Sequence, residues 1–194
     1  MYCLAHAMIP ARLGLIEAQC DPEAAQAIFS NPELAAKTTL IPLDLTHQVL
    51  ADKEIQETLL QPPGRTLDLP ENPLNIRRLF YEILVFFAHT YSEVFGLKDG
   101  PPLHDPIAVA VLLNHLGSPC LFDDHEGERW HVQVVTDGLH SERDEERGQL
   151  GRTVMTEAEK GGVRIPRGMN VTQFWVLIEF CLGLTQAAIA PLDE

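Results

Sequence analysis

Residues 100–110 read Gly-Pro-Pro-Leu-His-Asp-Pro-Ile-Ala-Val-Ala, a pattern that predicts the start of a helix with an adjacent His and Asp at its mouth. Gly100 and the two prolines after it form a turn that stops the preceding element. Asp105 suits the N-cap, and Pro106 suits the first helical position, where its missing N–H is no loss. We therefore expect His104 and Asp105 to be held at a rigid helix N-terminus.

This helix mouth has two interpretations. Asp105 is either a plain helix cap, or a carboxylate that is presented to a cleft with the neighbouring imidazole, as metal ligand and proton donor. The pair Asp21-Pro22 opens another predicted helix without a neighbouring His, so a cap alone explains an Asp-Pro pair. Taken by itself, the motif favours the cap.

Two further strings change this balance. Residues 20–25 read Cys-Asp-Pro-Glu-Ala-Ala, and residues 40–46 read Leu-Ile-Pro-Leu-Asp-Leu-Thr. Together with Leu-His-Asp-Pro at 103–106, and in this order, they closely resemble the C-terminal half of the inosine/uridine-preferring nucleoside hydrolases, from about Cys20 to about Leu184. The resemblance implies an open α/β fold that cleaves the N-glycosidic bond of ribonucleosides with a tightly bound calcium ion.

The resemblance also implies roles for the two residues at the helix mouth. Breaking a ribosidic bond passes through an oxocarbenium-like sugar, which requires an activated water, a grip on the ribose and stabilisation of the leaving base. Asp105 matches the family's C-terminal calcium ligand, and His104 matches the histidine beside it that faces the base. We therefore expect His104 to be catalytic, both residues to contact the substrate, and Asp105 to bind the metal.

Two parts of the family pattern have no match in this sequence. The aspartate cluster D-x-D-x-x-x-D-D, which supplies the other calcium ligands and the general base, does not occur. Where the family reads Glu-Phe-Asn, the chain has Leu15, Ile16 and Glu17. The predicted organisation is a non-family segment at 1–19, followed by the C-terminal part of a nucleoside hydrolase domain at 20–194. A truncated gene, an alternative start or a misplaced exon boundary would each produce this.

These departures leave two functional hypotheses. The first is an N-ribohydrolase that needs aspartates from another chain or from an unrecorded N-terminus and is inactive as written. The alternative is a non-catalytic truncated relative that acts as a binding or interaction module. On either hypothesis, displaced first strands would leave the predicted strand at 38–43 without neighbours, exposing apolar surface or an unpaired edge.

Composition limits the partners. The 194 residues include 14 basic and 28 acidic side chains, for a formal charge of −14, which argues against nucleic acid and against an anionic membrane surface. A neutral small substrate or a cation fits better. The resemblance implies a ribonucleoside substrate such as inosine or uridine, and a homo-oligomer, because the family often forms dimers or tetramers. The four cysteines have no CxxC spacing and no secretory signal is evident, so we expect a cytoplasmic protein.

The periodicity of apolar residues alternates between helix and strand. Helices are predicted at 21–29, 52–60, 73–95 and 105–117 and from 170 onward, and strands at 38–43, 130–136 and 150–155, the last two antiparallel across a charged connection at 139–149. The runs 79–88 and 174–190 each carry a glutamate, fall short of a membrane span and are expected to be core helices. The predicted fold class is α/β, a Rossmann-like open and mostly parallel sheet with flanking helices and a small antiparallel pair near the C-terminus.

Three residues at the end of the strand at 38–43 are given structural roles. Asp44 and Thr46 are expected to satisfy backbone groups at the strand-to-helix turn. His47 is expected to bond to its own loop, with a position facing the cleft as the alternative.

Overall fold

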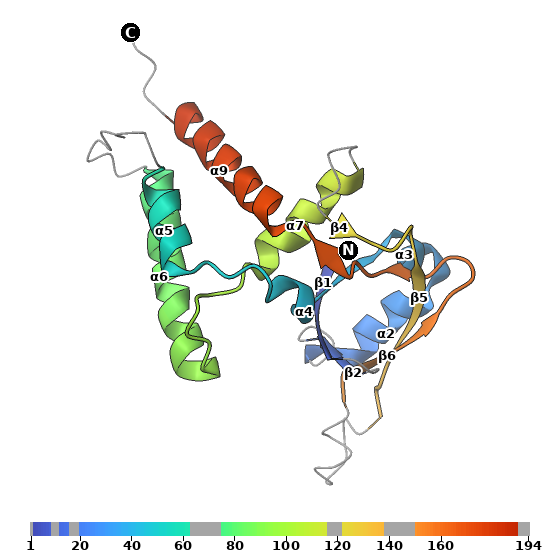
Figure 1. Ribbon diagram of the computed structural model, residues 1–194. Helices are drawn as coiled ribbons and strands as arrows, with labels where there is room; N and C mark the ends of the chain where they lie inside the picture. Colours follow the sequence, from blue (N-terminus) through green and yellow to red (C-terminus); the bar gives the residue numbers. More distant parts are fainter. Residues whose placement is uncertain are drawn as a thin grey trace. The chain divides into compact units, whose positions relative to one another are not determined.

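The computed structural model describes residues 2–8, 12–15, 20–62, 75–115, 122–137 and 150–189. These residues form two compact units (Figure 1). The first unit comprises Met1–Gln48 and His104–Asn170 and contains the strands, and the second comprises Val49–Leu103 and Val171–Glu194 and contains the longest helices. The predicted connection at 139–149 lies outside the described residues.

A curled mixed sheet forms the centre of the first unit. Its strands are β1 (Tyr2–Met8), β2 (Arg12–Leu15), β3 (Thr39–Pro42), β5 (Arg129–Val134), β6 (Arg152–Glu157) and β7 (Val163–Arg164), in the closed order β1-β2-β6-β5-β7-β3. The pairs of β3 with β1 and with β7 are parallel, and the other pairs are antiparallel. A separate antiparallel pair joins β4 (Phe122–Asp123) to β8 (Gly168–Met169).

The α/β class is confirmed, and so is the antiparallel pair predicted at 130–136 and 150–155, which is β5 and β6. The prediction of an open and mostly parallel sheet is wrong in its detail. Strands β5 and β6 close the sheet. Strand β6 pairs with β2, and β5 pairs with β7, which in turn pairs with β3. Closing the sheet in this way satisfies the backbone groups that free edge strands would expose.

Strand β3 has neighbours on both sides, contrary to the expectation of an unpaired edge. It pairs in parallel with β1, with Tyr2 opposite Thr39, and with β7, with Thr39 opposite Arg164. All four of its residues are buried. The N-terminal residues of the chain thus supply the strand that covers this edge.

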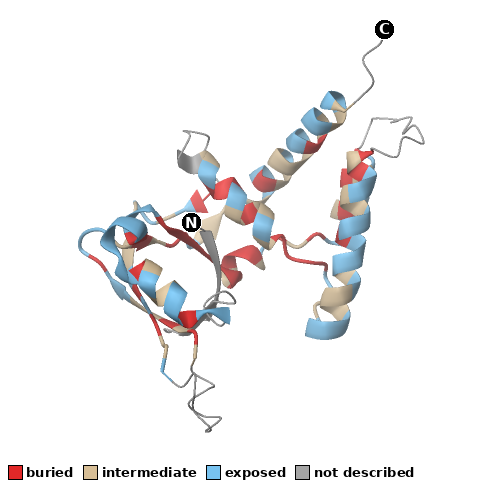
Figure 2. Cartoon of the chain, turned by 180° about the vertical axis from the view of Figure 1, so that it is seen from behind, coloured by how far each residue is buried: buried red, intermediate tan, exposed pale blue. Residues whose placement is uncertain are grey.

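Two short helices complete the core of the first unit. Helix α2 (Pro22–Ser30) begins as predicted at Asp21, whose Oδ1 accepts a hydrogen bond from the Ala24 N–H at 2.9 Å. Helix α3 (Pro32–Lys37) follows directly after its cap, Asn31. Figure 2 shows the buried segments in red. The buried core contains Phe29, Ala35, Leu40, Val132, Val134, Val163 and Ile165. Two helices and three strands therefore share one apolar cluster.

One guanidinium group links the three helices of the second unit. Its helices are α5 (Lys53–Leu60), α6 (Ile76–Phe95) and α9 (Val171–Ala188). Arg77 of α6 is 2% exposed and donates to both carboxylate oxygens of Glu179 on α9, at 2.7 and 2.8 Å. Its Nη1 also donates to the carbonyl oxygen of Leu59 on α5, at 2.8 Å. One side chain thus ties three helices together.

The apolar faces of α6 and α9 are largely exposed, so the prediction of two core helices is wrong about burial. Helix α6 ends at Phe95, as predicted, with Gly96 after it in the left-handed region, yet Phe86 and Val94 are each 66% exposed. On α9, Val176, Phe180 and Leu184 recur every four residues and form an exposed stripe. Periodicity specified these helices correctly, but burial needs a second layer of protein that the described residues do not supply.

Helix α9 is also long and apolar enough to cross a membrane, judged by length and composition only. Glu179 lies in the middle of this helix, and its carboxylate is paired with buried Arg77. A charged pair at mid-helix favours packing against protein, because ionised side chains inside a bilayer are costly.

We expect the isolated chain to self-associate through these exposed faces, because contiguous apolar surface on a soluble chain is covered by association. Replacing Val176 and Phe180 together by serine should shift the chain toward monomer in size-exclusion chromatography with light scattering. Thr172→Ser, at an exposed polar position of the same helix, should leave the distribution unchanged. A monodisperse wild-type monomer at every protein concentration tested would contradict this expectation.

Candidate active site

The candidate site in the first unit lies where the C-terminal end of one short helix meets the N-terminus of another. Strand β3 runs directly into the single-turn helix α4 (Leu43–Thr46), and helix α7 (His104–His115) packs against α4. Helix α7 begins at His104, so Asp105 lies within its first turn and the prediction that Asp105 is the N-cap is wrong. The backbone just before the helix is held by a hydrogen bond, in which the Leu103 N–H donates to the Val49 carbonyl at 3.2 Å. A carboxylate in the first turn still interacts favourably with the helix dipole.

The imidazole of His104 is bonded to Thr46. Its Nδ1 lies 2.7 Å from the Thr46 hydroxyl oxygen, and that hydroxyl donates to the Leu43 carbonyl at 3.1 Å. Thr46 is fully buried. The backbone role expected for Thr46 is therefore confirmed, and the same hydroxyl also orients the candidate catalytic histidine.

A second histidine lies beside the first. The ring of His47 is 5.6 Å from that of His104 between centroids, with an angle of 47° between the planes. The pKa of His104 is lowered to about 4, mainly by burial and also by the positive charge that His47 can carry, while Asp105 opposes this by raising the pKa. His104 is therefore uncharged at neutral pH, although the sequence suggested a proton donor.

Asp105 is exposed at the mouth of α7, where its carboxylate offers hard oxygen ligands of the kind that calcium prefers. Within the part of the chain that the structure describes, no group of three or more His, Cys, Asp and Glu side chains could hold a metal ion. Asp105 thus fits one position in a calcium site and cannot form that site alone, since calcium takes about 6–8 oxygens.

The sequence predicted that His104 and Asp105 lie together, because they are adjacent, but it gave Thr46 and His47 structural roles and did not predict that Thr46 bonds to His104. The available signal was the string at 40–46, which resembles the family as closely as the string at 103–106 does. Two such strings at the ends of neighbouring elements indicate that their side chains meet. Which atoms meet depends on how α4 packs on α7.

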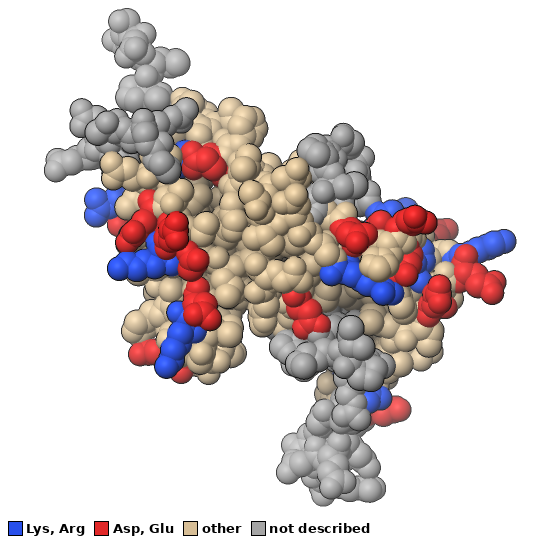
Figure 3. Space-filling view, in the orientation of Figure 1, with Lys and Arg blue, Asp and Glu red and all other residues tan. Residues whose placement is uncertain are grey.

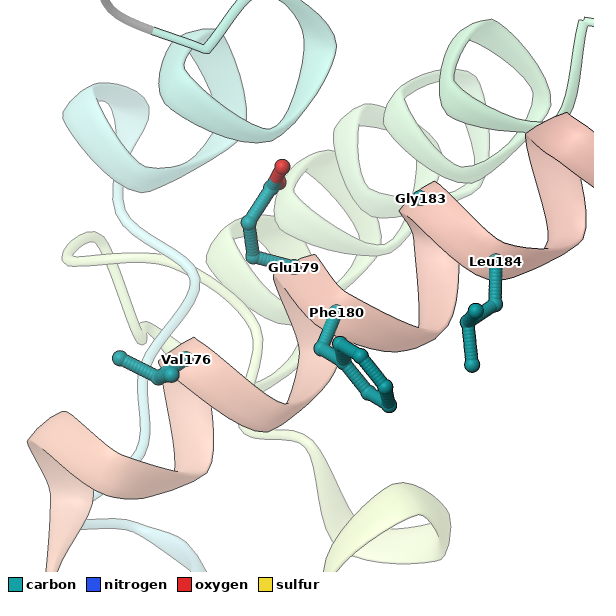
Figure 4. Close-up of a pocket in the computed structure, with 5 residues that line it drawn as sticks. All are labelled: Val176, Glu179, Phe180, Gly183 and Leu184. Atoms are coloured by element: carbon teal, nitrogen blue, oxygen red, sulfur yellow. The ribbon is translucent and has the colours of Figure 1, made fainter.

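The described surface also contains a hollow of about 460 Å³ on α9. Its lining residues are Val176, Glu179, Phe180, Gly183 and Leu184. Figure 4 shows Glu179 pointing to one side of the helix and Phe180 and Leu184 pointing to the other. All of these residues belong to one helix of the second unit, so the hollow is part of the exposed apolar stripe.

Charged side chains of both signs are interspersed on the face shown in Figure 3. The ion pairs of the described residues include Arg78 with Glu82 at 3.0 Å and Arg164 with Asp124 at 3.0 Å. Local pairing of this kind is typical of a solvated surface.

The lowered pKa of His104 predicts a pH dependence of stability. The pKa of this histidine is 6.5 in the unfolded chain and about 4 in the folded chain. Between these two pH values the unfolded chain binds a proton at His104 and the folded chain does not. Stability should therefore be complete above pH 6.5 and fall as the pH is lowered toward 4, by on the order of 1–2 kcal/mol because the ring is partly exposed. The free energy of unfolding in urea, measured between pH 6.5 and 4, should fall more steeply in the wild type than in His104→Gln. Parallel curves would contradict the shift.

Comparison with known proteins gives a consistent result. The family model for inosine-uridine preferring nucleoside hydrolase matches residues 17–176. A uridine nucleosidase of Saccharomyces cerevisiae is 38% identical over 97 residues, which are 50% of this chain and 26% of that protein. A probable ribonucleoside hydrolase of Dictyostelium discoideum is 30% identical over 166 residues, which are 81% of this chain and 41% of that protein.

A solved plant nucleoside hydrolase, the PpNRh1 enzyme, superposes with a TM-score of 0.60 at 18% identity, covering 94% of this chain and 51% of that structure. This likeness supports the fold. The chain spans about half the length of these relatives or less. Since the family model covers most of the chain, the protein belongs to the inosine-uridine preferring nucleoside hydrolase family.

Proposed function

We propose that the chain forms part of an N-ribohydrolase that cleaves ribonucleosides such as inosine or uridine into base and ribose. The observation that carries this proposal is the histidine–aspartate pair at the mouth of α7, with His104 held by Thr46 from a second element. The relatives named uridine nucleosidase and probable ribonucleoside hydrolase support the same substrate class. No observation favours the alternative of a purely non-catalytic binding module.

In this proposal Asp105 supplies one oxygen ligand to calcium and helps to hold the substrate. A bound calcium ion would polarise a water molecule for attack on the ribose. His104 lies beside Asp105 and faces the base, where a partly buried imidazole takes part in proton transfer. The remaining calcium ligands and the general base come from outside the described residues, since those residues offer no group of three metal-binding side chains.

Complementation tests this proposal. The chain would be co-expressed with the portion of the Saccharomyces uridine nucleosidase that it does not match, and ribose release from inosine and uridine would be measured with and without calcium. We expect release by the co-purified complex and none above buffer by the chain alone. Asp105→Asn should abolish release, because a metal ligand is lost, whereas Asp99→Asn, at another exposed aspartate, should leave it unchanged.

Two outcomes would contradict the proposal. A soluble complex that binds calcium but releases no ribose from any nucleoside tested would reject the activity. Release that is unaffected by Asp105→Asn would keep the activity and reject the role of Asp105.

A further inference from the structure

An antiparallel β-bridge between Leu50 and Pro102 lies next to the candidate site in the sequence. One side of this bridge follows α4, and the other side leads directly into α7. The Ala51 N–H donates to the Pro101 carbonyl at 3.0 Å, and the hydrogen bond of the Leu103 N–H, at 3.2 Å, is the second link. The bridge therefore joins the two segments that carry the histidines of the site.

Gly100 is the residue that allows these two segments to approach so closely. Its φ is +117°, a backbone conformation that residues with a side chain rarely adopt. A Cβ at this position would lie 2.4 Å from the Ala51 carbonyl oxygen and 2.9 Å from the Asp52 nitrogen. Both contacts are with backbone atoms, so no side chain can move to relieve them. Only glycine fits here while the bridge is closed.

The backbone opposite Gly100 is itself held in place. Ala51 is fully buried, and its carbonyl oxygen accepts a hydrogen bond from the Gln56 side chain at 2.7 Å. Asp52 is the N-cap of α5. Because this side of the bridge is anchored, a side chain at position 100 would displace its own segment, which leads into His104.

We infer that Gly100 is a positioning residue for the candidate site, because it keeps the bridge closed and thereby holds the rings of His47 and His104 together. Helix α4 is a single turn, and His104 is the first residue of α7, so neither ring lies within a long helix. A single turn is not stable by itself. The bridge fixes the chain beside each histidine and so limits how far the two rings, 5.6 Å apart between centroids, can separate.

The consequence for activity rests on the proposed function, although the positioning itself does not. In the complemented protein, Gly100→Ala should lower kcat by roughly 10²-fold, since a misplacement of about 1 Å can have this effect. The change in KM should be smaller, because Gly100 does not touch the substrate in this proposal.

Nuclear Overhauser effects between the two imidazoles test the positioning without any measurement of activity. The whole chain would carry protonated histidine in a deuterated background, and His47→Gln and His104→Gln would identify the cross-peak by its loss. We expect the cross-peak in the wild type and in Gly96→Ala, where φ is +71° and nothing lies within 4 Å of an added Cβ. Gly100→Ala should lose the cross-peak while its helical circular dichroism stays unchanged.

A wild type without the cross-peak would overturn the inference, and so would a folded Gly100→Ala variant that keeps it or an equal loss in Gly96→Ala. If Gly100→Ala does not fold, amide hydrogen exchange of the wild type decides. Slow exchange at Ala51 and Leu103 would support the closed bridge, whereas exchange as fast as in an unfolded chain would overturn the inference. Complemented protein that releases no ribose but shows the expected cross-peaks would reject the proposed function and keep this inference.

Discussion

Replacing Arg77 by methionine is expected to destabilise the second unit by about 3 kcal/mol, because it leaves the carboxylate of Glu179 without its bidentate partner. The substitution also removes the donor to the Leu59 carbonyl, so α5 loses its link to the other two helices. The measurement is the free energy of unfolding in urea, followed by circular dichroism at a helical wavelength.

The adjacent residue provides a matched control. Arg78 pairs with Glu82 at 3.0 Å, but the two side chains are 72% and 59% exposed. Arg78→Met should therefore cost less than about 1 kcal/mol. Replacing both Arg77 and Glu179 by apolar residues should recover much of the loss, since no charge is then left unpaired. Equal effects of Arg77→Met and Arg78→Met would contradict the role assigned to the buried guanidinium.

Substitution of His104 by alanine in the catalytically complemented protein is expected to slow ribose release by roughly 10² to 10⁴, the usual contribution of a group that transfers a proton. The effect should fall on kcat more than on KM, because the interaction strengthens as the base leaves. His89→Ala, which removes an exposed histidine of α6, should leave both constants unchanged.

A His104→Ala variant with wild-type turnover would show that stabilisation of the base does not depend on this imidazole. A change in KM alone would assign His104 to substrate binding. Either result would leave the family membership of the chain intact, since that rests on the match over residues 17–176.

Local signals in the sequence predicted the helices well. Asp21 and Asp52 each cap the helix that follows, and Gly96 ends α6 with a left-handed φ of 71°, because these residue types satisfy or terminate a helix through contacts within a few residues. The antiparallel β5–β6 pair was predicted for a similar reason, since alternating residues on both sides of one polar connection specify it. Adjacency in the chain likewise placed His104 and Asp105 together.

The sequence by itself thus determined the α/β class, the principal helices with their caps, the family and the pair of residues at the mouth of α7. Only the tertiary structure decided the closure of the sheet, the exposure of the α6 and α9 faces, the burial of Arg77 and the bond between Thr46 and His104. The physical reason is the separation along the chain of the residues that interact. A cap or a helical period is fixed by neighbours in the chain, whereas pairing, burial and side-chain hydrogen bonds depend on segments that meet only after the chain has folded.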